Sequence, residues 1–258
     1  MTRHRSFLIV LPTFNERDNL SRIVNRVLES SPHADVLIID DSSPDGTAEI
    51  ARTLMQHSDR VLLIERPVKM GLGSAYIRGF KESLSNGYRA VCTMDADNSH
   101  DPAVLPAMFE ALENADLVIG SRYVAGGLTN QGVARRANSA IANFLARSVL
   151  ELPVKDCTSG YRLYSTDVLR KLELTELRSR GYSMLVELLC EVVEKGGRVS
   201  EVPIAFCDRS AGESKVGAHE IWESLRTIAR LRRGKFGDTR TRLANELYRI
   251  LPIKNKMR

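Results

Sequence analysis

The chain has 258 residues, of which 43% are hydrophobic and 27% are charged. This composition is typical of a globular protein and excludes a disordered or fibrous chain. The net charge is +5, and no apolar run approaches the length of a membrane span, so a helix that crosses a bilayer is not expected.

The first half of the chain alternates short apolar segments with segments in which apolar residues recur at helical spacing. Strands are predicted at residues 6–11, 36–39, 61–64, 90–94 and 117–120, and helices at 17–30, 47–56, 74–85 and 103–114. This alternation predicts an α/β fold with a mainly parallel sheet that is covered by helices on both faces. In such sheets ligands bind outside the carboxyl ends of the strands.

The second half is less regular. Helices are predicted at 134–150 and around 184–194, a strand at 198–202, and further helical patterns at 221–232 and 241–251. Because no repeat or linker interrupts the chain, we expect one catalytic domain over residues 1–220 and a basic, amphipathic helical appendage over 221–258. The four cysteines show no CxxC spacing, and we expect reduced, partly buried thiols in a cytoplasmic protein.

Polar clusters follow four of the predicted strands. They are Pro12-Thr13-Phe14-Asn15-Glu16, Asp40-Asp41-Ser42-Ser43, Asp95-Ala96-Asp97-Asn98-Ser99-His100 and Gly120-Ser121-Arg122-Tyr123. Because the carboxyl ends of parallel strands meet at one edge of a sheet, these clusters are expected to build one site.

Asp95 and Asp97 are the strongest candidates for metal ligands. Alternate side chains of an extended segment share a face, so both carboxylates can point the same way and bind one cation. Mg²⁺ and Mn²⁺ prefer such oxygen ligands, with substrate phosphate oxygens completing the shell. The alternative is helix capping, which explains Asp101 before Pro102 but not the two earlier aspartates.

Two further segments favour contact with a nucleotide or phosphate. We expect the Asp41 carboxylate to accept hydrogen bonds from a nucleotide base or ribose. Asp45-Gly46, by contrast, is expected to form a turn. Residues 69–74 form a glycine loop that opens a helix, and its amides and Lys69 can meet a phosphate. Tight turning alone explains those glycines equally well.

Several arginine and lysine residues stand mainly in predicted loops beside Gly and Ser, where the backbone can approach a ligand closely. Planar guanidinium groups suit phosphate oxygens, although most arginines in proteins are simply solvated. These candidates are Arg122, Arg135, Arg136, Arg162, Arg209 and Lys215.

Together these motifs make the chain similar to the family-two glycosyltransferases of the GT-A fold, and within them to the polyprenol-phosphate (dolichol-phosphate) mannose synthases. The resemblance extends from Ser6 to about Lys215. It depends on residues 12–16, 40–47, 71–76, 95–102, 120–123, 159–162, Arg209 and 214–215.

The resemblance implies a role for each matching position. Donor binding would involve Pro12, Phe14, Glu16, Asp41, Lys69, Gly71, Asp95, Ala96, Asp97, Arg209 and Lys215. The metal would face Asp95, Asp97 and Ser99, although some relatives carry glutamine in place of Ser99. The acceptor phosphate would meet Arg122, Arg135 and Ser139, and the groups closest to the chemistry would be Asp97 and Arg122.

The implied reaction is inverting transfer of mannose from GDP-mannose to a polyprenyl monophosphate, with Mg²⁺ or Mn²⁺ as cofactor. Glucosyl transfer from UDP-glucose to the same lipid is the alternative. A phosphate monoester is already largely a dianion near neutral pH, so we expect no indispensable side-chain base.

The basic C-terminal segment, residues 230–258, suggests how such an enzyme would reach a lipid. Residues 230–258 contain ten Lys or Arg against two Asp or Glu, with apolar stripes in the predicted helices 221–232 and 241–251. We expect the first stripe to pack on the core and residues 241–258 to contact an anionic membrane surface peripherally. A nucleic-acid partner is not expected because few aromatic residues accompany the basic ones. A solvated end that only aids solubility is the alternative.

Overall fold

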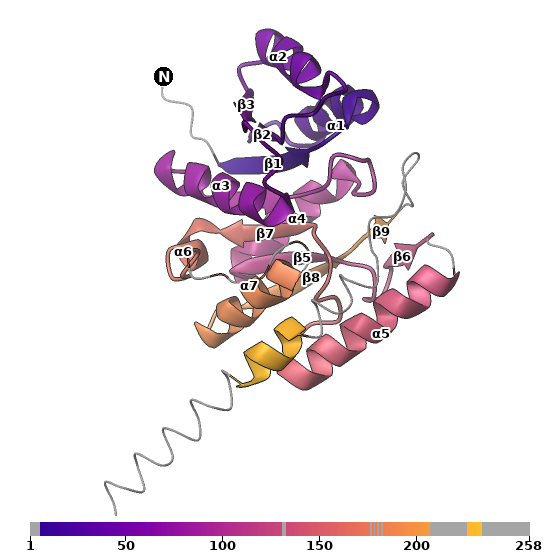
Figure 1. Cartoon of the computed structure of the whole chain (residues 1–258). Coiled ribbons are helices and arrows are strands. Elements are labelled where there is room, and N and C mark those ends of the chain that lie inside the picture. The colour runs from indigo at the N-terminus through magenta and orange to yellow at the C-terminus, as the bar shows by residue number, and fades with distance from the viewer. Residues whose placement is uncertain are drawn as a thin grey trace, which may run out of the picture.

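The computed structural model describes residues 6–130, 133–175, 177, 179, 181, 183–206 and 226–233, with backbone alone for 133–138. Its main sheet has seven strands in the order β3-β2-β1-β4-β7-β5-β8 (Figure 1). Six of them run parallel, namely β1 (Phe7–Thr13), β2 (Ala34–Asp40), β3 (Val61–Glu65), β4 (Ala90–Thr93), β5 (Leu117–Ser121) and β8 (Val199–Pro203). The predicted α/β fold with a mainly parallel sheet is confirmed.

Helices cover both faces of the sheet, as expected. One core contains residues of α1 (Arg17–Ser30), α2 (Thr47–His57) and α4 (Leu105–Ala111). The opposite core contains residues of α3 (Leu72–Ser85), α5 (Val133–Leu150), α6 (Thr166–Leu169) and α7 (Ser183–Glu194). Strand β1 contributes alternate residues to the two cores, because successive side chains of a strand point to opposite faces.

The predicted helix at 103–114 is divided in the structure. A 3₁₀ turn at Pro102–Val104 precedes α4, and a second one at Leu112–Asn114 follows it. Pro106 has no N–H to donate to the carbonyl of residue 102, so the first turn cannot continue as regular α-helix.

Strand β7 (Arg162–Ser165) was not predicted and is antiparallel to both β4 and β5. It separates the two strands whose carboxyl ends carry Asp95 and Arg122. A further pair of short strands, β6 (Leu128–Thr129) and β9 (Ala205–Phe206), forms a separate parallel ladder beside this edge.

Helix α3 approaches β1 closely through a glycine. A Cβ atom placed on Gly79 would lie 2.6 Å from Cγ2 of Val10, well inside van der Waals contact. Because protein cores are close-packed, this position admits no larger side chain without displacement of the helix. The contact holds the middle of α3 against β1.

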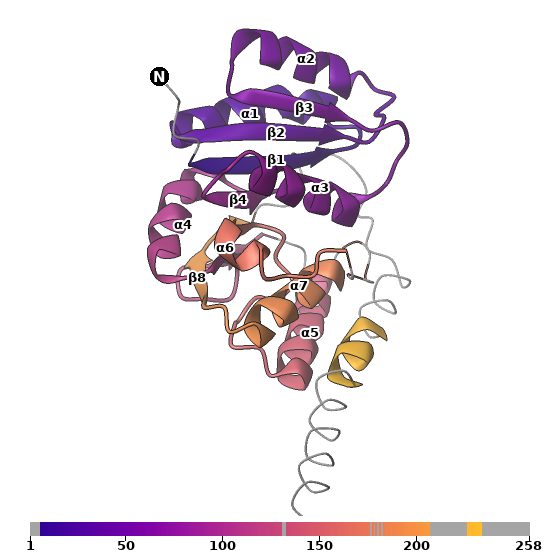
Figure 2. The same cartoon turned by 90° about the vertical axis from the view of Figure 1, so that its left-hand side faces the viewer.

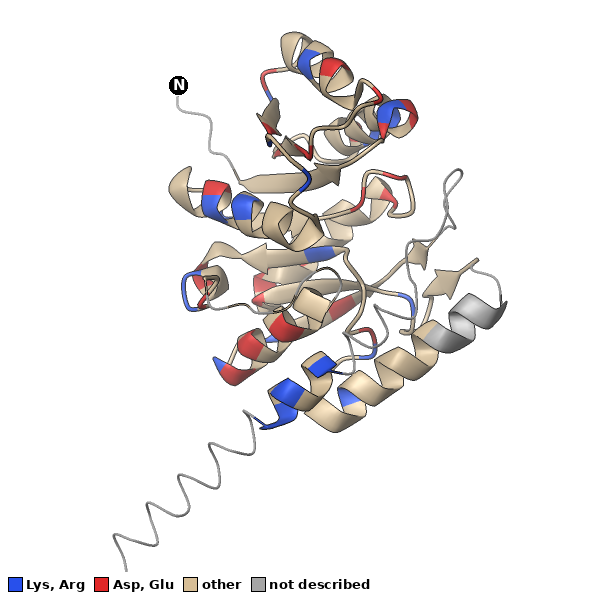
Figure 3. Cartoon of the chain, viewed as in Figure 1, with Lys and Arg blue, Asp and Glu red and all other residues tan. Residues whose placement is uncertain are grey.

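A helix at residues 226–233 lies beside α5 and α7 (Figure 2). Ile228 is only 8% exposed and belongs to the core, and Arg230 Nη2 lies 3.0 Å from Glu187 Oε1 of α7. The expectation that the first apolar stripe packs on the core is confirmed for these residues. Figure 3 shows basic residues along this helix and acidic residues along the neighbouring α7. Within the described ranges, no helix is long and apolar enough to cross a membrane.

Candidate active site

The predicted polar clusters meet at one edge of the sheet. Strands β1, β2, β4 and β5 all end there because they run parallel within the sheet. The chain crosses from one side of β1 to the other between β3 and β4, which makes the gap between β1 and β4 a topological switch point. Ligands of open α/β sheets bind at such a point.

Asp41, which follows β2, holds the glycine loop in place. Its Oδ2 accepts hydrogen bonds from the amides of Met70 and Gly71 at 3.1 and 2.9 Å, and its other oxygen pairs with Arg66. The carboxylate is buried, and Gly71 has a φ of 86°, which favours glycine. Asp41 therefore orients the loop, and the predicted contact with a nucleotide is not visible in its geometry.

The loop brings Lys69 to the end of β1. Lys69 Nζ lies 3.7 Å from the centroid of the Phe14 ring, which is a cation–π distance. Phe14 and Lys69 were both predicted to bind the donor, and the structure brings them together. Pro12 lies within β1, paired with Ile39, and is only half-buried.

Glu16 begins α1, and its surroundings connect the ends of β1 and β4. Its amide donates to Thr47 Oγ1 at 3.0 Å, and its carboxylate accepts from Asn19 Nδ2 at 2.9 Å. Asn19 in turn accepts from Asn98 Nδ2 at 3.1 Å, so a chain of hydrogen bonds reaches the aspartate motif. Asp45 accepts from the amides of Thr47 and Arg17, which confirms its structural assignment.

The Asp95-Ala96-Asp97 motif forms a tight loop after β4. Asp97 is 5% exposed, and its Oδ1 accepts the amide of Ser99 at 3.0 Å. Asp95 is half-buried and lies 3.5 Å from the Tyr76 hydroxyl of α3. Asn98 has a φ of 64°, a left-handed conformation that asparagine tolerates better than most residues. The loop thus places both aspartates just beyond the carboxyl end of β4.

The oxygen atoms of this loop suit a hard divalent cation. The hydroxyl of Ser99 is buried and has no hydrogen-bond partner among the described residues, so its oxygen is free to join the two carboxylates as a ligand. Among the described residues, no group of three or more His, Cys, Asp or Glu side chains is arranged so that it could hold a metal ion. Two carboxylates and a hydroxyl fit Mg²⁺ or Mn²⁺, which usually keep water or substrate phosphate in their remaining positions. Asp101, by contrast, caps the following turn through Ala103 N, as the capping interpretation expected.

His100 lies between the aspartates and Arg122. Its Nδ1 accepts the amide of Asp95 at 3.0 Å, so the neutral ring carries its proton on Nε2. Its ring stacks on Tyr161 at 4.9 Å and meets Phe206 edge-on at 5.8 Å. Burial lowers the pKa of His100, although the neighbouring Asp95 and Asp97 act in the opposite direction. The imidazole therefore serves as a neutral spacer that fixes the start of the loop.

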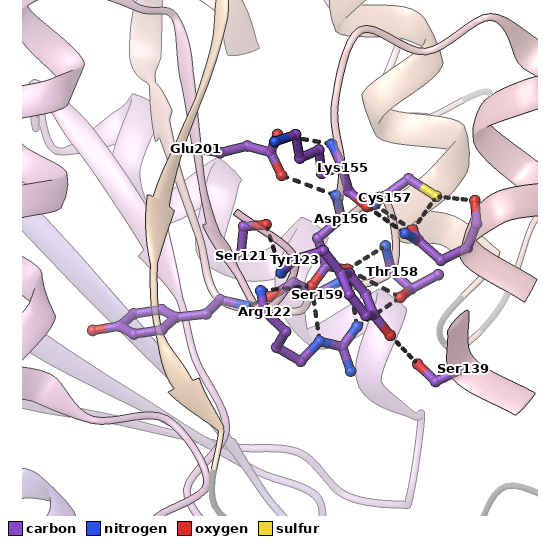
Figure 4. Close-up of polar contacts among 12 residues, drawn as sticks. Ser121, Arg122, Tyr123, Ser139, Lys155, Asp156, Cys157, Thr158, Ser159 and Glu201 are labelled. Atoms are coloured by element: carbon purple, nitrogen blue, oxygen red, sulfur yellow. Dashed lines mark hydrogen bonds and ion pairs between the residues drawn. The ribbon is translucent and has the colours of Figure 1, made fainter. Parts of the chain in front are cut away.

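Arg122, at the end of β5, is held by Asp156 (Figure 4). Its Nε and Nη2 donate to the two carboxylate oxygens at 2.8 and 2.9 Å, and its backbone N donates to Oδ2 at 3.1 Å. Asp156 is fully buried, and the Arg122 side chain is 9% exposed. Burial alone would raise the pKa of Asp156, but Arg122 and backbone amides outweigh it, and the pKa lies below its ordinary value.

Arg122 also faces the aromatic group beside His100. Its guanidinium carbon lies 5.6 Å from the centroid of Phe206 and 5.3 Å from that of Tyr123. Phe206 thus touches both His100 and Arg122, so one ring separates the aspartate loop from the arginine. The charge of Arg122 is already balanced by Asp156, which limits how strongly it attracts a further anion.

Ser139, on α5, joins this group through Tyr123. The Tyr123 hydroxyl donates to Ser139 Oγ at 3.2 Å, so the predicted acceptor residues Arg122 and Ser139 lie on either side of Tyr123. A hollow of about 160 Å³ opens next to them and is lined by Tyr123, Ala140, Asn143, Phe144, Arg147 and Lys155. Arg135 lies on α5 where only the backbone is described, and Arg209 and Lys215 lie outside the described residues.

Arg162 is not part of the cationic set, and its inclusion was wrong. The residue is fully buried, and its guanidinium donates to the carbonyls of Ser159, Leu185 and Cys157 at 2.8, 2.5 and 2.7 Å. These bonds satisfy backbone carbonyls around β7. A buried arginine of this kind stabilises the fold and presents no charge to a ligand.

Several residues of the site were not assigned a role from the sequence. They are Tyr76, His100, Asn143, Asp156, Phe206 and Glu201. Asp156 stood in a Gly/Ser-rich segment next to residues of the recognised motif, so its position was a usable signal. The others depend on tertiary contacts, which spacing along the chain does not reveal.

Comparison with known proteins relates the sequence to one family. The sequence model of glycosyl transferase family 2 matches residues 8–173. An undecaprenyl-phosphate mannosyltransferase of Micrococcus luteus is 40% identical over 224 residues, which is 86% of this chain and 92% of the relative. A polyprenol monophosphomannose synthase of Mycolicibacterium smegmatis is 41% identical over 225 residues, covering 86% and 85%.

Solved structures show the same fold at lower identity. A glucosyl-3-phosphoglycerate synthase from Mycobacterium tuberculosis, in complex with Mn²⁺, UDP and phosphoglyceric acid, superposes with a TM-score of 0.64 at 20% identity, over 89% of this chain and 78% of that one. A mannosyltransferase from Pyrobaculum calidifontis, in complex with GDP-Man and Mn²⁺, gives 0.55 at 15% identity, over 85% and 60%. The fold is therefore of the GT-A type.

Proposed function

The chain belongs to glycosyl transferase family 2 and is a glycosyltransferase, and from that premise we propose that it moves mannose from GDP-mannose to a polyprenyl monophosphate. The names of the two relatives with about 40% identity support mannose as the sugar and a polyprenyl phosphate as the acceptor. The catalytic domain is proposed to span residues 1–220, with the basic appendage over 221–258.

One observation carries this proposal. The loop of residues 95–99, which is rich in oxygen ligands, and the buried Arg122–Asp156 ion pair lie at the same edge of the sheet. The rings of His100 and Phe206 lie between them. The loop suits a cation with a diphosphate, and the ion pair stands beside a serine hydroxyl that suits a single phosphate. A transferase with two phosphate-bearing substrates needs such neighbouring subsites.

On the donor side, Asp95, Asp97 and Ser99 would hold Mg²⁺ or Mn²⁺. When bound, the ion offsets negative charge on the departing nucleoside diphosphate. The remaining donor contacts are proposed to come from Pro12, Phe14, Glu16, Lys69, Gly71, Ala96, Arg209 and Lys215, and Asp41 is proposed to act on the donor side through the loop that it holds. The geometry of the described ones supports a division of work, in which Phe14 and Lys69 face the donor and Asp41 orients their loop.

On the acceptor side, Arg122, Arg135 and Ser139 would orient the lipid phosphate. A phosphate monoester has a second pKa near ~6, so its oxygen is anionic at neutral pH and needs no base. That oxygen bonds to the anomeric carbon while the bond to the diphosphate oxygen breaks, and the electron pair leaves with GDP. One displacement of this kind inverts the anomeric configuration.

The buried titratable groups of the site support a reaction without a side-chain base. The Nδ1 atom of His100 is occupied by the amide of Asp95. Asp156 accepts from Arg122, from the amide and hydroxyl of Thr158 and from the amide of Ser159, and its pKa is lowered. Neither group is arranged to take up a proton.

Contact with a membrane surface is proposed to bring the enzyme to its lipid. The basic residues of 230–258 are worth roughly 1 kcal/mol each near an anionic leaflet. Helix α5 adds an apolar face, because Ile141, Phe144 and Leu145 are 58%, 61% and 39% exposed and recur at helical spacing. Flotation with anionic vesicles should weaken at high salt and on deletion of residues 241–258; unchanged flotation would count against this role.

The function is tested by incubating the protein with a polyprenyl phosphate and either GDP-mannose or UDP-glucose, with and without a chelator. We expect a chloroform-soluble mannosyl lipid that requires divalent ion and forms faster from GDP-mannose. Faster glucosyl transfer would instead favour the UDP-glucose alternative, and transfer to water alone with either donor would refute the acceptor.

A further inference from the structure

Asn143 is a buried polar residue in the middle of α5. It is 4% exposed, and both ends of its amide bind the backbone of residues 155–157. Its Oδ1 accepts from the amide of Cys157 at 2.8 Å and from the thiol at 2.9 Å, and its Nδ2 donates to the carbonyl of Lys155. A buried amide is costly unless it is satisfied in this way, so these bonds fix α5 against the segment.

The same segment carries the partner of Arg122. Asp156 lies between the two residues that Asn143 binds, and its carboxylate accepts three hydrogen bonds from Arg122. Glu201 of β8 accepts from the amides of Lys155 and Asp156 at 2.7 and 2.9 Å (Figure 4). The segment is thus clamped by α5 on one side and by the sheet on the other.

Asn143 stands one helical turn after Ser139, so the two residues share a face of α5. Ser139 reaches Arg122 through Tyr123, and Asn143 reaches it through Asp156. The helix therefore meets the end of β5 by two routes that converge on one arginine. A shift of α5 along its axis would change the spacing between Ser139 and Arg122 unless the Asn143 bonds prevented it.

We infer that Asn143 is a positioning residue, which keeps the Ser139 face of α5 in register with Arg122 and so sets the width of the acceptor phosphate site. The inference depends on the proposed function, because it assumes that the phosphate binds between these residues. Asn143 acts through the backbone of residues 155–157 and need not touch the substrate.

The test compares Asn143→Ala and Asn143→Leu with wild type. Leucine keeps the side-chain volume and removes the hydrogen bonds, which separates bonding from packing. Loss of two or three buried hydrogen bonds should raise the KM for polyprenyl phosphate roughly tenfold or more. The KM for GDP-mannose and the Mn²⁺-dependent binding of GDP should change less than about twofold, since the aspartate loop has its own supports.

Asn86→Ala is the control for loss of an exposed asparagine amide, because Asn86 donates to the backbone carbonyl of Glu82 within its own turn at the end of α3. It should leave both KM values unchanged. Folding of every variant is checked by circular dichroism, and kinetics are measured well below its melting temperature. Asn143→Asp, which retains the acceptor for Cys157 N–H, is the reserve if the other two do not fold.

The inference is overturned if a folded variant keeps the wild-type KM for the acceptor, or if donor and acceptor KM rise together. Failure of all three variants to fold would likewise show a role in folding and not in positioning. If wild type itself transfers no mannose to the lipid phosphate, the proposed function fails. Binding of the lipid phosphate alone, measured by calorimetry, then decides the position of the phosphate: equal affinity for wild type and Asn143→Leu overturns the inference.

Discussion

Replacement of Asp156 by asparagine would remove the partner of a buried cation. The Arg122 side chain is 9% exposed. The Asp156 carboxylate accepts hydrogen bonds from the Nε, Nη2 and backbone N of Arg122. An asparagine amide in place of Oδ2 would point its own donors at two of those N–H groups. The variant therefore leaves a buried charge unpaired and also opposes donor to donor.

The expected cost is large on the scale of domain stability. Breaking a buried ion pair from one side costs about 3–5 kcal/mol, whereas a whole domain is stable by roughly 5–15 kcal/mol. Equilibrium unfolding in urea, followed by circular dichroism, measures the loss as a lower midpoint at similar slope. A double variant, Arg122→Met with Asp156→Leu, should cost less than Asp156→Asn alone because no charge remains unpaired.

Asp167→Asn provides the matched control. Asp167 pairs with Arg170 at 2.7 Å, but the two side chains are 83% and 55% exposed, so its loss should cost less than about 1 kcal/mol. A loss of similar size for Asp156→Asn would refute the buried pair as described. The role of Arg122 in the site would then need another support.

Further expectations concern stability, the metal and the acceptor. Because the pKa of folded Asp156 is lowered, its contribution to the free energy of unfolding should be complete above the unfolded pKa of about 4 and disappear as the pH falls further, and urea midpoints should show this loss in wild type but not in the double variant. Gly79→Ala should destabilise the protein by about 1–3 kcal/mol, because its Cβ would lie 2.6 Å from Val10; an unchanged urea midpoint would contradict this packing. Asp97→Asn should make GDP binding insensitive to Mn²⁺ in calorimetry, and retention of the full metal dependence would remove Asp97 from the metal site. Ser139→Ala should raise the KM for the lipid phosphate and not that for GDP-mannose, and a rise in both would place Ser139 elsewhere.

Much of the fold follows from patterns within the chain. The helix predicted at 17–30 matches α1 at both ends, because a complete apolar stripe identifies an amphipathic helix. Strand β7 was missed since its four residues show no clear alternation and pair only with strands distant in sequence. Register between distant strands depends on tertiary packing, which local periodicity does not encode.

Some residues of the site could likewise be predicted from the sequence, and others could not. The loop of Asp95 and Asp97 was found because its residue types and its position after a strand carry the chemical signal. Arg162 was misassigned because a loop of small residues does not reveal whether an arginine points to solvent or into the core. Asn143 was not predicted because its role depends on hydrogen bonds with two backbone atoms, the carbonyl oxygen of Lys155 and the amide of Cys157.

The anomeric configuration of the product tests the central claim most directly, that the lipid phosphate itself displaces GDP. The mannosyl lipid made from GDP-α-mannose would be isolated, and its configuration at C1 read from the one-bond carbon–hydrogen coupling in NMR. We expect the β-anomer, which results from a single displacement that needs no side-chain nucleophile or base. The α-anomer would contradict it, since retention requires an enzyme-bound intermediate or a different approach of the phosphate.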